Sequence, residues 1–202
     1  MPARTAIPAA ILLLIGHFAP WAAHKTAALT LSAHELAVFT HFTPGAGIFL
    51  NQWFYLPLWS AALLGALLAG GMASRVNRLL AGLGCAVVAS LGLPGYPQVL
   101  TAFRSPDYAL QFYISIAVMA LVVVAALGRL GRVRRARAAV LALVPLLAAV
   151  PLAGYLAIKP FIEQLYGGSV GIGSGWWITL AGVLAALAAW FAEWRQRRNG
   201  CP

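Results

Sequence analysis

The sequence contains few charged residues and very few acids. Of its 202 residues, 4 are Asp or Glu, 14 are Lys or Arg, and charged residues make up only 9% of the chain. Soluble proteins carry charge on roughly 25% of their residues. Because 62% of the residues are hydrophobic and no polar stretch is long enough for a separate soluble domain, the composition predicts one transmembrane domain spanning residues 1–202.

Cysteine and catalytic motifs are also scarce. Cys85 falls within an apolar run and Cys201 lies in the polar tail, so no disulfide is expected between them. The sequence has no CxxC pair, no zinc-protease motif and no Ser-His-Asp pattern, which favours a protein that is not an enzyme. The glycine-rich stretch 167–175 lacks the lysine of a phosphate-binding loop, and we interpret it as a turn.

Long apolar runs dominate what is present. Each is close to the roughly 20 residues that a helix needs to cross a bilayer, and helices satisfy their own backbone groups in lipid. The sequence therefore predicts an all-α, polytopic protein with six transmembrane helices, and Pro94-Gly95-Tyr96-Pro97 is expected to shorten the third. The six apolar runs are Ala6 to Ala23, Trp53 to Ala73, Leu79 to Tyr96, Leu110 to Leu127, Ala138 to Ile158 and Trp176 to Trp194.

The basic residues predict the orientation of these helices. If the N-terminus lies inside, eleven arginines face the cytoplasm, whereas only Lys25, Arg104 and Lys159 face out. This asymmetry follows the positive-inside rule and places both termini in the cytoplasm. The abundance of Ala, Gly and Arg, with two lysines in the chain, suggests a GC-rich bacterial genome and hence the inner membrane. The arginines behind the net charge of +10 fall in short clusters between the apolar runs, as in membrane proteins, so nucleic acid is not an expected partner.

The six helices are expected to form three hairpins with larger connections on the outer side. Aromatic residues and prolines mark the outer ends of the helices, and arginines mark the inner ends. In the first outer connection, Ser32 and Glu35 have capping-box spacing, which predicts a short amphipathic helix over about 31–43. Weaker versions of this pattern cover Gln98 to Phe103 and Pro160 to Tyr166.

The histidines and acids are the candidates for binding chemistry. All four histidines lie in the first quarter of the chain, and three of the four acids are expected on the outer side. A separation of seven between His17 and His24, or between His34 and His41, fits a shared metal poorly, so no metal site or cofactor is predicted. Haem bound through His17 stays an alternative. The candidate ligand-binding residues are His17, His24, His34, Glu35, His41, Asp107 and Glu163.

Two functional hypotheses follow from these observations. The first is a non-catalytic subunit of a larger membrane complex such as a transporter, packed against a membrane-protein partner or a second copy of the chain. The alternative is a small-molecule binder or transporter whose site opens outward near His17, Glu35 and the Pro94-Gly95 break, where an interrupted helix can line a cavity. On the inner side, a basic cluster is expected to contact lipid headgroups or a partner: Arg132, Arg134, Arg135 and Arg137.

Overall fold

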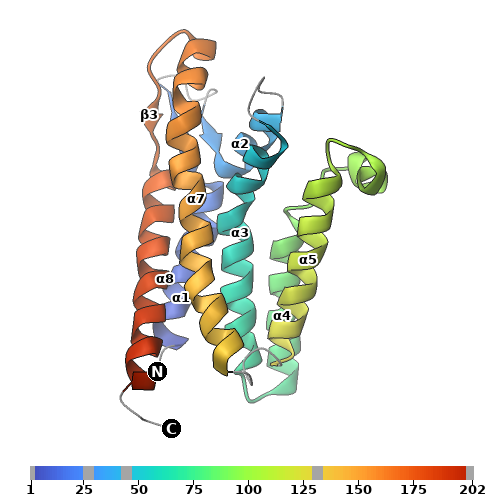
Figure 1. The fold of residues 1–202 in the computed structure, drawn as a ribbon, viewed down its shortest axis with the longest axis vertical. Coiled ribbons are helices and arrows are strands. Elements are labelled where there is room, and N and C mark those ends of the chain that lie inside the picture. Colours follow the sequence, from blue (N-terminus) through green and yellow to red (C-terminus); the bar gives the residue numbers. More distant parts are fainter. Residues whose placement is uncertain (1–2, 25–29, 42–46, 129–133, 199–202) are drawn as a thin grey trace.

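The protein folds into a helical bundle with a small sheet at one end (Figure 1). The computed structural model describes residues 3–24, 30–41, 47–128 and 134–198, which contain seven α-helices. The helices are α1 (Ala3–Phe18), α2 (Ala33–His41), α3 (Gly47–Gly70), α4 (Arg75–Ser90), α5 (Ala109–Ala126), α7 (Arg134–Tyr166) and α8 (Ser174–Arg198). Strands β1 (Pro20–Ala23), β2 (Leu31–Ser32) and β3 (Gly171–Ile172) form the sheet, and η2 (Gln98–Leu100) and η3 (Ala102–Arg104) are short 3₁₀ turns.

A helix lies on each of the six predicted apolar runs. Among the described helices, α3, α5, α7 and α8 are long and apolar enough to cross a membrane. Helices α1 and α4 have 16 residues each and are shorter than their predicted runs. Helix α4 ends at Ser90, before Pro94 and Pro97, so the expected shortening of the third helix is confirmed.

Helix α3 is the centre of the bundle. It packs against α1 and α7 on one side and against α4 and α5 on another, and α8 lies against α1 and α7. Large buried side chains of the core include Phe54, Leu58 and Leu64 from α3, together with Leu13 from α1. Helix α3 therefore joins two groups of helices, as Figure 1 shows.

The predicted amphipathic helix is present and begins as its sequence indicates. Helix α2 starts after Ser32, whose backbone N–H and hydroxyl both donate to the Glu35 carboxylate at 2.7 Å. The Glu35 N–H donates back to the Ser32 hydroxyl at 3.3 Å, which completes a capping box. The capping residues thus confirm the start of α2, while residues 42 and 43 of the predicted range lie outside the described residues.

The small sheet was not predicted from the sequence. Its strand order is β2-β1-β3, with both pairs antiparallel, and it joins the α1–α2 connection to the α7–α8 connection. A Cβ on Gly173 or Gly175 would overlap the backbone carbonyls of Pro20 and Ala19. Glycine is therefore required where the second half of the glycine-rich stretch packs against β1.

Two other predicted outer helices have different structures. The segment Gln98 to Phe103 forms the turns η2 and η3 rather than an amphipathic helix, since Pro97 and the short length limit it to single turns. The segment Pro160 to Tyr166 is the last part of α7 and does not form a separate element. Pro160 is accommodated within α7, so it does not mark a boundary between helices.

Candidate functional site

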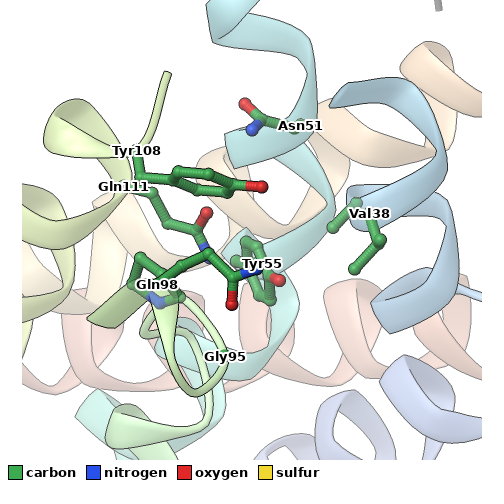
Figure 2. Close-up of a pocket in the computed structure, with 9 residues that line it drawn as sticks. Val38, Asn51, Tyr55, Gly95, Gln98, Tyr108 and Gln111 are labelled. Atoms are coloured by element: carbon green, nitrogen blue, oxygen red, sulfur yellow. The ribbon is translucent and has the colours of Figure 1, made fainter. Parts of the chain in front are cut away.

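A pocket opens between α2, α3 and the loop that follows α4. Val38 comes from α2, and Asn51 and Tyr55 come from α3. Gly95 comes from the loop after α4, Gln98 from η2, and Tyr108 and Gln111 from the start of α5. In Figure 2 the two tyrosines and Gln111 surround the same space, with Val38 on the opposite wall. Pro94 and Gly95 line this pocket, as the interrupted helix suggested, but His17 and Glu35, which were expected beside them, do not line it.

The loop wall of the pocket is held by one backbone carbonyl. The Gly92 carbonyl accepts hydrogen bonds from the Gln111 amide at 2.9 Å and from the Ser115 hydroxyl at 2.8 Å. Gln111 and Ser115 are both buried, and a Cβ on Gly92 would overlap the indole of Trp59. The end of α4 is therefore fixed against α3 and α5, and this contact positions Pro94 and Gly95.

The pocket has the chemistry of a site for a small uncharged molecule. Its volume is about 240 Å³, slightly below the roughly 300–1,000 Å³ of sites for drug-sized ligands. Most of its exposed lining is apolar, and the polar residues that line it are Asn51, Gln98, Gln111, Tyr55 and Tyr108. The Gln111 amide donates to Gly92, and the Asn51 amide oxygen accepts from Gln52. None of the described residues that line it carries a formal charge, so hydrogen bonding and contact with aromatic rings are the available interactions.

Behind Tyr55, two of the predicted histidines lie together. The ring centres of His17 and His34 are 5.7 Å apart, and those of His34 and Tyr55 are also 5.7 Å apart. The distance from His17 to Tyr55 is 6.1 Å, so the three rings form a nearly equilateral triangle. This group brings together the end of α1, the first turn of α2 and the first half of α3.

His17 is fully buried and lacks ordinary polar contacts. The Phe54 backbone is near its ring, yet neither ring nitrogen forms a hydrogen bond of good geometry with the described part of the chain. The Nδ1 atom of His34 is likewise buried and unpaired among these residues. Each unsatisfied buried polar group lowers the free energy of unfolding by about 1–3 kcal/mol, so this cluster destabilises the fold.

Two groups on α2 have altered pKa values. Burial lowers the pKa of His34, and this effect outweighs the opposing influence of the neighbouring Glu35 carboxylate. The pKa of Glu35 is lowered because the Ser32 N–H and hydroxyl bond to its charged form. Glu35 is therefore ionised at neutral pH and serves the capping box, while His34 is neutral.

The remaining predicted histidines and Asp107 do not join this cluster. The ring of His24 packs against Tyr166, with 5.9 Å between the ring centres. His41 is the last residue of α2, and its side chain lies outside the described part of the structure. Asp107 is exposed in the turn before α5 and does not line the pocket, although the adjacent Tyr108 does.

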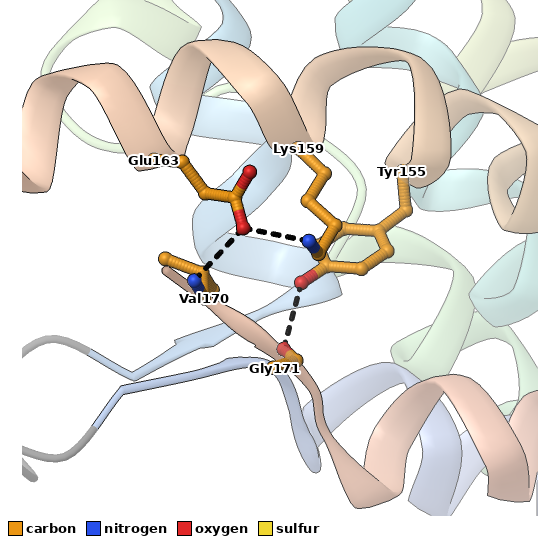
Figure 3. A network of polar contacts seen from close by, with 5 residues as sticks. All are labelled: Tyr155, Lys159, Glu163, Val170 and Gly171. Atoms are coloured by element: carbon orange, nitrogen blue, oxygen red, sulfur yellow. Dashed lines mark hydrogen bonds and ion pairs between the residues drawn. The ribbon is translucent and has the colours of Figure 1, made fainter. Parts of the chain in front are cut away.

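Glu163 takes part in a structural network at the end of α7 (Figure 3). Its carboxylate accepts from the Lys159 ammonium at 2.7 Å and from the Val170 backbone N–H at 3.0 Å. The Tyr155 hydroxyl donates to the Gly171 carbonyl at 3.1 Å. These contacts hold the chain before β3 against α7, and they occupy Glu163 within the fold.

The predicted basic contact cluster is described only in part. Arg132 lies outside the described residues, and Arg134 and Arg135 begin α7 with side chains that the structure does not describe. Arg137 forms an ion pair with Glu193 of α8 at 3.2 Å. Arg137 therefore joins α7 to α8, with part of its side chain still exposed.

Sequence reasoning missed the main pocket residues apart from Pro94 and Gly95. Tyr55 and Tyr108 resemble ordinary interfacial aromatic residues in the sequence, and Asn51 and Gln111 resemble polar helix ends. The signal available was the density of amide residues on the outer side, close to both Pro94 and the histidines. Which of these residues meet in one pocket depends on contacts between segments that are far apart in the sequence, so it could not be predicted.

The function of this site could not be assigned from similarity to known proteins. Comparison of the chain with protein-family models, with curated proteins and with solved structures found no match in any of the three.

Proposed function

We propose that the chain is a six-span protein of the bacterial inner membrane that binds a small, uncharged, polar molecule from the outer side. The observation that carries this proposal is the pocket of about 240 Å³ lined by amides and tyrosines. Such a pocket suits hydroxyl or amide groups on a compact ligand, which can accept and donate hydrogen bonds while contacting the aromatic rings.

The proposed topology has support from the ends of the bundle. In Figure 1, α1 begins and α8 ends at one end, while the sheet and α2 lie at the other. The first end also holds the start of α4 with Arg75 and Arg78, and the end of α8 with Arg195. Under the positive-inside rule this end is cytoplasmic, and the pocket lies near the outer end. Packing of α1 on α3, α4 on α5 and α7 on α8 supports the arrangement as three hairpins.

A pocket-filling variant tests the binding proposal. Purified protein is screened by thermal unfolding against a panel of uncharged polyols, amides and ureas, and at least one class is expected to raise the melting temperature of the wild type. Gln98→Trp, which fills the pocket mouth, should remove this effect, whereas Gln164→Trp on an exposed position of α7 should retain it. Absence of any stabilising compound, or equal stabilisation of Gln98→Trp, would overturn the proposal.

The second candidate function is a subunit of a larger membrane complex. An apolar groove of about 220 Å³ lies over α3 between α1 and α4, and its walls include Ala61, Ala62, Gly65, Ala81 and Gly84. Small residues allow helices to approach closely in lipid, so this groove suits a transmembrane helix of a partner subunit. A Cβ on Gly84 meets no described atom within 4 Å, which leaves room for such a helix.

Purification in a mild detergent from the native host tests this second function. A stoichiometric membrane-protein partner should be lost with Gly84→Leu and retained with Ala181→Leu, which makes a similar change on an exposed position of α8. If the chain purifies alone, or if both variants keep the partner equally, the groove is not the contact surface.

A further inference from the structure

We propose that His17 and His34 together bind one copper(I) ion beside the outer pocket. This inference does not rest on the proposed ligand-binding function, since neither of the two proposed copper ligands lines the pocket. The two histidines come from α1 and α2, which the chain folds together at the end of the bundle that carries the sheet.

The distance between the two imidazoles fits a shared ion. A metal about 2.1 Å from one nitrogen of each ring places the ring centres roughly 5–6.5 Å apart as the N–metal–N angle opens from tetrahedral to the nearly linear angle that two-coordinate copper(I) prefers. The observed distance between the ring centres is 5.7 Å. Both nitrogens of His17 and Nδ1 of His34 are buried without hydrogen-bond partners among the described residues, so these ligand atoms do not have to break other contacts.

The surroundings favour a monovalent ion with few ligands. The described part of the chain contains no group of three His, Cys, Asp or Glu residues suited to a metal, which disfavours a closed four-ligand zinc site. The nearest acid in sequence is Glu35, whose carboxylate is engaged by Ser32. Because burying a single charge costs less than burying two, a buried pair of imidazoles without a free carboxylate suits copper(I) better than a divalent ion.

Tyr55 separates the proposed copper site from the pocket. Its ring packs near both histidines, and the residue also lines the pocket. We therefore assign Tyr55 as a wall of the copper site and not as a ligand. Phe18 completes the apolar surroundings, since its ring contacts both imidazoles.

Copper(I) binding is measured on the purified full chain by competition with a coloured copper(I) chelator. Cysteine also binds copper(I), so the background is the Cys85→Ala, Cys201→Ser double variant. The expected result is one copper per chain. Affinity should fall at least tenfold in His17→Gln and in His34→Gln, and should be unchanged in His24→Gln, which is the matched control.

X-ray absorption on the copper-loaded double cysteine variant, with all four histidines in place, gives a second test that does not depend on how the histidine variants fold. The expected spectrum has two imidazole nitrogen neighbours and no sulfur neighbour. Failure to bind copper(I), equal binding by all three histidine variants, a sulfur neighbour, or binding of zinc in place of copper would each overturn the assignment.

Discussion

At the residue scale, Ser32 and Glu35 form the capping box that begins α2, and their spacing is readable in the sequence. Their reciprocal bonds start α2, and α2 then positions His34 against His17 and Val38 against the pocket. One side-chain pair therefore supports both candidate sites. The two sites also share Tyr55, whose ring faces the histidines while the residue lines the pocket.

Removing the cap should loosen α2. Ser32→Ala deletes the hydroxyl that bonds to Glu35 and is expected to lower the free energy of unfolding by about 1 kcal/mol. The measurement is reversible thermal unfolding in one detergent, with Ser169→Ala at an exposed loop position as the control. Equal melting temperatures for Ser32→Ala and the control would show that the cap does not stabilise the fold.

The same pair predicts a pH dependence. The pKa of Glu35 is lowered in the folded protein from its ordinary value of 4.5, so its contribution is fully present above that value and is lost as the pH falls below it. Glu35→Gln can keep the capping geometry but does not titrate, so its stability should change less between pH 6 and pH 3, roughly the range where a carboxyl titrates. Parallel pH profiles for the wild type and Glu35→Gln would contradict this role.

At the element scale, helices were predictable and the sheet was not. Six apolar runs each contain a helix, because a helix satisfies all the backbone groups of such a run within the run itself. The strands have only four, two and two residues, which is too short for a period-two pattern to appear in the sequence. The His17–His34 pair was missed for a related reason, since helical spacing relates residues on one helix and not on two.

Two glycines with different surroundings predict different effects of substitution by alanine. Gly173→Ala should destabilise the protein by about 1–3 kcal/mol, because the new methyl group meets the Pro20 backbone rather than a flexible side chain. Gly84→Ala, where the space is open, should be neutral or stabilising by up to about 1 kcal/mol. Melting temperatures in the same detergent compare them, and a similar loss in both would refute the close packing at Gly173.

The Glu163 network predicts a local change in dynamics. Glu163→Ala removes the acceptor of the Val170 N–H and the partner of Lys159, so hydrogen exchange at Val170 should become faster. Glu163→Gln keeps an acceptor oxygen and should retain most of the protection. Unchanged exchange in Glu163→Ala would mean that β3, and not Glu163, holds this segment.

At the scale of the whole molecule, the position of both proposed sites depends on which end of the bundle faces out. The six apolar runs, the arginine-rich end and the polar pocket near the opposite end are consistent with one orientation, in which the pocket is open to the outside. Both the proposed ligand site and the proposed copper site lie near that outer end. A reversed orientation would make both of them cytoplasmic.

Cysteine labelling in intact cells is the most direct test of this orientation. In a background without Cys85 and Cys201, single cysteines replace Gln98 at the pocket and Gln196 near the end of α8, both of which are exposed. A membrane-impermeant maleimide should label Gln98→Cys in intact cells and Gln196→Cys only after the membrane is opened. Labelling of Gln196→Cys in intact cells, with Gln98→Cys protected until the membrane is opened, would contradict the outward-facing pocket.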